Sequence, residues 1–165
     1  MNEPDVPVPG KPVAVSRTVA TTPQHVYDQL ADGWLLPVWL VGAAHIRAVD
    51  ATWPAVGSRV HHSVGIWPVL VSDTTRVVSV DPPHDLVLHA RIWPVGEARV
   101  QLTMDADGNG TCVTMTEAAA RGPARWFDNP VQRWWLKRRN AESLARLAAV
   151  AERRPGQRSA VDTAK

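Results

Sequence analysis

Glu117 is the first candidate for acid or base chemistry in this sequence. Val113, Met115 and Glu117 share one face of a predicted strand, because successive side chains of a strand point to opposite sides. The two apolar neighbours mark that face as the inner one, where a partly desolvated carboxylate is a candidate general acid or base. The alternative is that Glu117 reaches solvent, because it lies at the end of its strand.

His62 is the second candidate catalytic residue. Val60, His62 and Val64 share one face of another predicted strand, which turns His62 inward and His61 toward water. An imidazole in a cavity can move protons or bind a polar ligand atom. The competing interpretation is a core histidine held by a hydrogen bond.

The last predicted helix carries a buried stripe interrupted by one amide. Leu136, Asn140, Leu144, Leu147 and Ala151 fall on one side at 100° per residue. A buried amide needs partners, so Asn140 either orients a ligand carbonyl or hydroxyl or bonds the backbone of a strand.

Basic residues precede Asn140 on the same helix. Arg133 lies near the stripe and could meet a ligand carboxylate, pair with Glu117 or remain exposed. The basic run at 137–139 is interpreted as the solvated side of the helix.

Tryptophan is unusually abundant, with eight residues against one Phe and one Tyr. Successive turns of an antiparallel meander fall at alternate ends of the sheet, which places one group of aromatic residues at the same end. We expect these side chains either to form the mouth of an apolar pocket or to plug the end of the core. They are Trp39, Trp67, Trp93, Trp126 and Phe127. Trp53 falls at the opposite end and is predicted to be structural.

No metal or cofactor site is predicted. The histidines show no ligand spacing such as His at i and i+4, and the sequence has no Gly-rich phosphate loop. Residues 107–110 (DGNG) read as a hairpin turn rather than a calcium loop. The single cysteine, Cys112, excludes an internal disulfide and is expected to pack as a small hydrophobic residue.

Size and composition favour one soluble, cytoplasmic domain. The chain has 165 residues, a net charge of +2 and no apolar run near the ~20 residues of a membrane span. Integral membrane association and nucleic-acid binding are therefore not expected. Residues 13–153 are predicted to form the domain, and the segments 1–12 and 154–165 are expected to be disordered tails.

The order of predicted elements indicates an α+β fold. A strand at 13–19 precedes two short helices, one beginning at Pro23 and one around 34–40. A six-strand meander follows, and a long helix spans about 130–153, capped by Asp128 or Asn129. The six strands are predicted at 45–50, 58–64, 69–80, 85–92, 97–104 and 111–117. Such a helix must lie along a curved antiparallel sheet.

From residue 13 to residue 153 the sequence resembles the START-like or SRPBCC superfamily, in its polyketide cyclase/dehydrase branch. The resemblance rests on residues 17–23 (RTVATTP) with Val26 and Tyr27, and on 57–62 (GSRVHH). It also rests on 81–83 (DPP) and on 137–147 (KRRNAESLARL) in the last helix. The superfamily is related in fold to the birch-pollen allergen.

This resemblance implies a helix-grip fold with a deep cavity for lipids, polyketides or similar apolar metabolites. It does not choose one function, because the same architecture serves different activities. The favoured hypothesis is binding of a small hydrophobic ligand. The second is a cyclase or dehydratase in which Glu117, His62 or Arg133 moves protons or stabilises an enolate. The third is a protein-partner or co-chaperone-like module, and the chain is expected to be a monomer or a homodimer.

Overall fold

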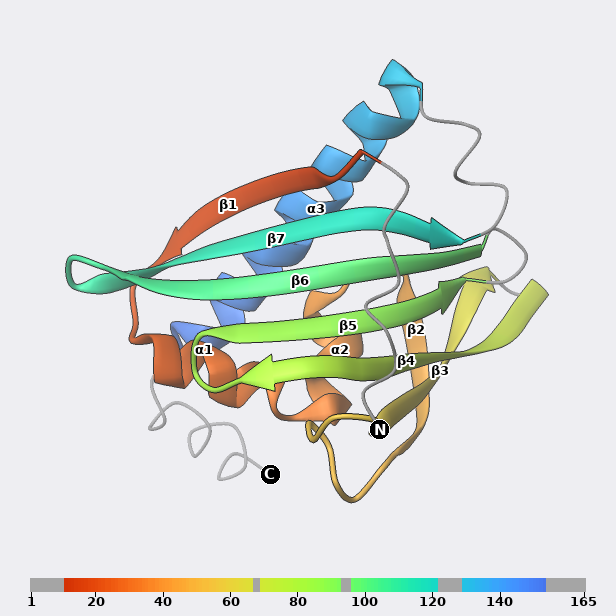
Figure 1. The fold of residues 1–165 in the computed structure, drawn as a ribbon, viewed down its shortest axis with the longest axis horizontal. Coiled ribbons are helices and arrows are strands. Elements are labelled where there is room, and N and C mark those ends of the chain that lie inside the picture. The colour runs from red at the N-terminus through yellow and green to blue at the C-terminus, as the bar shows by residue number, and fades with distance from the viewer. Residues whose placement is uncertain (1–10, 67–68, 93–95, 122–128, 154–165) are drawn as a thin grey trace, which may run out of the picture.

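The computed structural model describes residues 11–66, 69–92, 96–121 and 129–153 (Figure 1). Seven antiparallel strands form one curved sheet in the order β1-β7-β6-β5-β4-β3-β2. This confirms the predicted seven-stranded sheet. The strands are β1 (Val13–Val19), β2 (Ala43–Val49), β3 (Arg59–Ile66), β4 (Val69–Asp81), β5 (Asp85–Ile92), β6 (Gly96–Asp107) and β7 (Gly110–Arg121). Nearly all of both predicted tails lies outside the described residues, so their disorder stays a prediction.

The β6–β7 hairpin is longer than predicted. The sequence suggested a turn over residues 105–110, but Asp107 pairs with Gly110, so only two residues form the turn. The turn begins at Gly108, whose φ of 57° suits a residue without Cβ. The polar residues before it continue β6 as an exposed strand. The polar residues Asp105 and Asp107 therefore led to a predicted end of β6 that is too early.

The helices begin where the capping signals predicted. In α1 (Pro23–Leu30), Thr22 Oγ1 accepts a hydrogen bond from the His25 amide at 3.3 Å. In α3 (Pro130–Ala151), Asn129 Oδ1 accepts one from the Gln132 amide at 2.8 Å. Between them lie the short elements η1 (Gly33–Leu35) and α2 (Leu36–Trp39).

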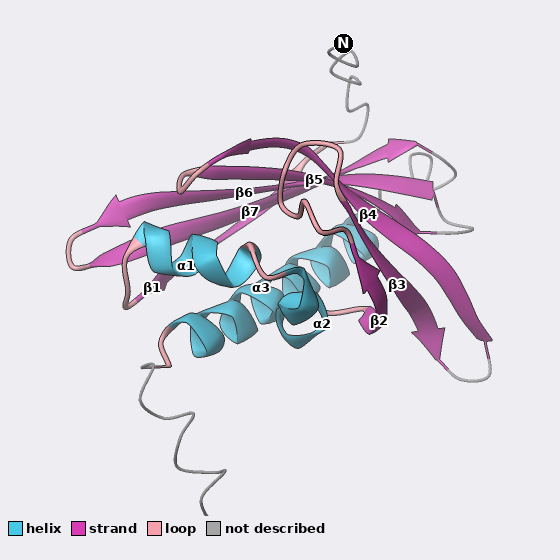
Figure 2. Ribbon diagram, turned by 90° about the horizontal axis from the view of Figure 1, so that it is seen from below, coloured by secondary structure: helices cyan, strands magenta, loops and turns pink. Residues whose placement is uncertain are grey.

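All helices cover the same face of the sheet, which is its concave face (Figure 2). Leu144, Leu147 and Ala151 of α3 are buried against residues such as Leu102 and Met115. Trp53 packs against this core, as predicted, and its indole N–H donates to the Leu30 carbonyl at 3.2 Å. None of the helices in the described ranges is long and apolar enough to cross a membrane.

Candidate functional site

A buried polar cluster joins β7 to the middle of α3. Glu117 is buried and forms an ion pair with the Arg139 guanidinium. Arg139 also donates from Nε and from a terminal nitrogen to Asn140 Oδ1, at 3.2 and 3.0 Å. The Asn140 side chain is fully buried, and its Nδ2 has no hydrogen-bond partner among the described residues. Within the described part of the chain, the Asn140 amide nitrogen is therefore a buried donor without a partner.

Arg139 corrects one prediction made from the basic run at 137–139. Lys137 and Arg138 are exposed as expected, but the Arg139 side chain is only 15% exposed and turns inward. Pairing with Glu117 was one of the three alternatives that the sequence left open for Arg133; in the structure Arg133 donates to the Lys11 carbonyl at 3.4 Å. Arg139 lies at the flank of the buried stripe, and its long side chain carries the charge from that flank to Glu117.

A second buried polar cluster lies on β3 and β4. His62 is buried, and its Nε2 lies 2.9 Å from Thr75 Oγ1. Its Nδ1 has no hydrogen-bond partner in the described part of the chain. Asp73 is directly across from His62 in the strand register and is also buried. The inward orientation predicted for His62 is confirmed, whereas His61 lies at the surface beside Asp50.

Burial lowers the pKa of His62 below its ordinary value of 6.5, because the charged imidazolium loses hydration. The nearby Asp73 carboxylate acts in the opposite direction, while Arg47 and His61 add to the lowering. The direction of this shift favours the neutral form of the His62 ring at pH 7. A neutral ring that uses Nε2 for Thr75 has Nδ1 left as either a donor or an acceptor, according to its tautomer.

Small side chains separate the two clusters on the concave face. Ala119 of β7 pairs with Ala98 of β6, Ala98 pairs with Ala90 of β5, and Ala90 pairs with Thr75 of β4. Strand alternation puts this row on the same face as the buried residues Val100 and Leu88. Ala98 is buried, and Ala90 and Ala119 are half-buried.

The structure does not bring Glu117 and His62 into contact. Their strands, β7 and β3, are separated by four strand spacings, which is about 19 Å along the sheet. The two candidate catalytic residues therefore do not form one acid–base pair. Glu117 has its polar neighbours on α3, and His62 has its polar neighbours on β4.

Trp39 is the one member of the predicted aromatic mouth that the structure describes. It is buried in the hydrophobic core, with its indole Nε1 lacking a hydrogen-bond partner among the described residues. Just after it, the Val41 amide donates to Ser143 Oγ at 3.1 Å, and Ser143 donates to the Arg139 carbonyl. The end of α2 thus lies against α3 within one turn of Asn140. Trp67, Trp93, Trp126 and Phe127 lie outside the described residues.

Sequence reasoning missed Asp73 and Thr75 as well as Arg139. A signal for the first two was present, because residues 73, 75 and 77 alternate on the same face of β4 as the buried Val77. Within the described residues, no group of three or more His, Cys, Asp or Glu side chains is placed to hold a metal ion.

The arrangement of a curved sheet around a long helix agrees with a family comparison. Residues 12–152 match a family described as polyketide cyclase / dehydrase and lipid transport. The chain belongs to this family. The resemblance predicted from its sequence is thereby confirmed, while no curated protein matches the sequence.

Solved structures share the helix-grip fold. A protein from Rhodobacter sphaeroides has a TM-score of 0.64 at 24% identity, over 84% of this chain and 91% of that one. The di-domain ARO/CYC StfQ from the steffimycin biosynthetic pathway has a TM-score of 0.66 at 14% identity, over 88% of this chain and 51% of that one. Ara h 8.0201 has a TM-score of 0.63 at 11% identity, over 86% and 97%. At these identities the likeness concerns the fold alone.

Proposed function

We propose that the protein binds a small hydrophobic ligand, such as a lipid or a polyketide, between the concave face of the sheet and α3. The observation that carries the proposal is the buried amide nitrogen of Asn140, which has no hydrogen-bond partner among the described residues. A cytoplasmic location belongs to the same proposal and is tested by fractionating cells of the host.

Unpartnered buried donors favour a ligand with acceptor oxygens. A buried polar group without a hydrogen bond costs about 1–3 kcal/mol, so native proteins rarely keep one unless water or a ligand completes it. Asn140 Nδ2 and Trp39 Nε1, on adjoining helices, are two buried donors that lack a partner among the residues the structure describes. A carbonyl or hydroxyl on an apolar ligand would satisfy them, while the body of the ligand contacts the neighbouring hydrophobic residues.

The row of small residues supports the location. Ala90, Ala98 and Ala119 line the sheet between the Glu117 and His62 clusters, so a ligand above them meets the polar groups only at its ends. The Arg139–Glu117 ion pair holds the guanidinium beside Asn140. A ligand carboxylate or enolate would find a cation there as well.

The test is equilibrium binding of the apolar fluorescent dye 1-anilinonaphthalene-8-sulfonate, followed by competition with fatty acids and aromatic polyketides. Ala98→Leu fills the proposed space, and we expect it to weaken binding by tenfold or more. Leu for Ala at 98 adds methylene volume that a packed core would reject at a cost of about 1–3 kcal/mol. Unchanged stability together with lost binding therefore supports an open interior.

The matched control is Ala106→Leu, which adds the same side chain at an exposed position of the same strand. The proposal fails if both variants bind the dye like the wild type. It also fails if Ala98→Leu destabilises the protein and the wild type does not bind any member of the panel.

A cyclase or dehydratase is the second candidate, and the neutral His62 favours it. A buried imidazole with one unpaired nitrogen is a competent proton acceptor for an acidic C–H beside a carbonyl. Conversion of a linear poly-β-keto substrate to a cyclic product would support this activity. Loss of that conversion in His62→Gln, with ligand affinity retained, would assign the proton transfer to His62.

A further inference from the structure

The outward face of α3 is apolar over its first two turns. Val131, Trp134 and Trp135 are 74%, 58% and 56% exposed. With Arg138 they fall within an arc of about 100° on the helix, opposite the buried side that carries Asn140. Farther along the helix, the same outward face carries the Glu142–Arg146 ion pair instead. Only the beginning of α3 breaks the usual rule that the solvent face is polar.

Two exposed cations lie beside these apolar side chains. Residues 130–141 contain four cations and no acidic residue. Arg139 turns inward to Glu117, and Arg133 lies about 20° from Asn140 around the helix and contacts Lys11, which leaves Lys137 and Arg138 exposed. Arg138 lies over the Trp134 ring at 5.1 Å from its centroid, so charge and aromatic face are presented together.

The same end of the helix carries an open groove of about 490 Å³, lined by Asn129, Val131, Gln132, Trp134 and Trp135. Figure 1 shows the first turns of α3 beyond the β1 edge of the sheet. The groove and the two indoles are therefore on a projecting end rather than in a flat surface.

We propose that this end of α3 docks on the surface of a membrane that contains anionic lipids. Trp side chains favour the membrane–water interface, and Lys or Arg beside them are attracted to acidic headgroups. The groove beside the rings gives the apolar part of a lipid a place to enter. Val131 and Trp134 face away from the interior, whereas the Trp135 ring also contacts the Arg139 guanidinium of the interior cluster, 5.6 Å from the ring centroid. Ligand binding is therefore measured beside vesicle binding for every variant.

Two other occupants fit the surface less well. In a symmetric dimer through this patch, the same surface of both copies would meet, which brings four cations, Lys137 and Arg138 of each copy, into one interface with no acidic residue from 130–141 to offset them. A specific protein interface usually needs about 20–30 residues on each side, far more than this projecting end offers. A lipid bilayer does not need a complementary surface of that size, because a few side chains can insert into it.

The test is co-sedimentation of the full chain with vesicles of phosphatidylcholine containing roughly one third phosphatidylserine. We expect binding that falls at high salt and is weak on phosphatidylcholine alone. Trp134→Ala with Trp135→Ala should lower the partition coefficient about tenfold or more, as apolar burial in the interface is lost. Lys137→Glu with Arg138→Glu should do the same through charge.

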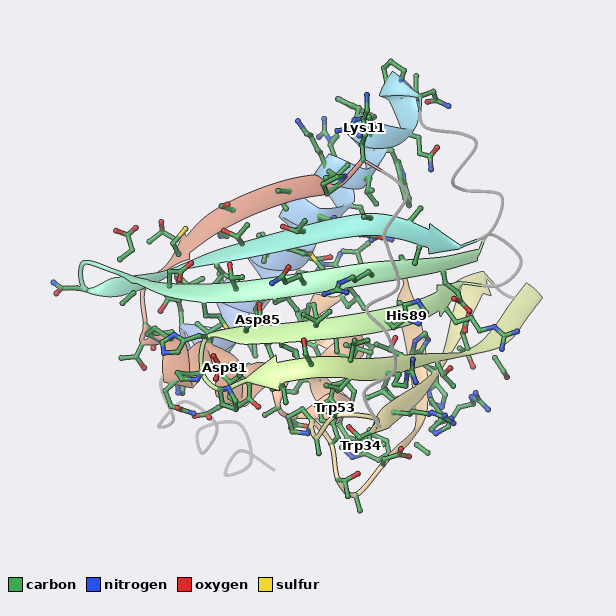
Figure 3. The ribbon with its side chains drawn as sticks, in the orientation of Figure 1. Lys11, Trp34, Trp53, Asp81, Asp85 and His89 are labelled. Atoms are coloured by element: carbon green, nitrogen blue, oxygen red, sulfur yellow. The ribbon has the colours of Figure 1, made fainter. Side chains whose placement is uncertain are left out.

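Two control variants are matched to these. Trp34 is also 58% exposed but lies on the opposite side of the molecule from Lys11, the contact of Arg133 near the start of α3 (Figure 3). Trp34→Ala should keep binding within about twofold, and so should Arg153→Glu, beyond the other end of α3.

Three results would overturn the proposal. The first is that the wild type does not bind anionic vesicles. The second is that Trp34→Ala weakens vesicle binding as much as the double variant Trp134→Ala with Trp135→Ala does. The third is that the wild type does not bind vesicles but forms a concentration-dependent dimer, and that the Trp134→Ala, Trp135→Ala double variant abolishes this dimer. That result would assign the surface to a second copy of the chain.

Discussion

Replacing Arg139 by Leu removes the partner of a buried carboxylate. Glu117 remains buried in β7, and the variant lacks both the ion pair and the two hydrogen bonds to Asn140 Oδ1. The leucine retains much of the apolar stem of arginine, so the main loss is charge and hydrogen bonding. We expect a large drop in the free energy of unfolding.

The size of the drop follows from the Glu117 carboxylate, which stays buried and loses its partner. Breaking a buried ion pair by removing one partner costs about 3–5 kcal/mol. Arg138→Leu, one residue away and exposed, should cost about 1 kcal/mol or less.

The assay is urea unfolding at pH 7, followed by circular dichroism. The double variant Glu117→Leu with Arg139→Leu should recover part of the stability, because a buried ion pair and an apolar pair of similar volume differ little. Asn140 Oδ1 still lacks its two hydrogen bonds from Arg139 in that variant. If Arg139→Leu costs no more than Arg138→Leu, Glu117 is open to water and the polar cluster is not part of a closed interior.

Two further predictions concern the histidine cluster and the hairpin. The folded-state pKa of His62 lies below 6.5, so below that pH the unfolded chain binds a proton that the folded chain does not. Its contribution to stability is present above pH 6.5 and is lost as the pH falls toward the folded-state pKa, by at most about 1.4 kcal/mol per pH unit. Urea unfolding from pH 8 to 5 should show a flatter decline for His62→Gln than for the exposed control His45→Gln, and equal declines would contradict the burial argument. Gly110→Ala should cost about 1–3 kcal/mol, because the added Cβ would lie 2.6 Å from the Val19 carbonyl oxygen. Asn109→Ala in the same exposed turn is the control for thermal unfolding, and an equal effect of the two would refute the steric reason.

The sequence was informative wherever a local signal decides the structure. Thr22 and Asn129 act as helix caps beside a proline, and both signals predicted the starts of α1 and α3. Alternation along β3 correctly turned His62 inward and His61 outward. The ends of β6 and β7 were less predictable, because a two-residue turn lets polar residues remain in strand pairing.

The site was predictable only in part. Periodicity placed Asn140 in the buried stripe, but no periodicity identifies the partner of Glu117. That partner depends on the distance between β7 and α3 and on how far a flexible arginine reaches. Arg133 and Arg139 are both basic residues of α3, and only the three-dimensional structure selects Arg139. The separation of Glu117 from His62 likewise follows from strand order, which one strand's pattern does not contain.

Native mass spectrometry of the protein purified from its own host tests the central claim most directly. We predict that the wild type carries a small apolar molecule that is released on denaturation, and that Ala98→Leu purified in parallel does not carry it. A wild type that is consistently empty, and that also fails to bind the dye and lipid panel, would contradict ligand binding in the interior.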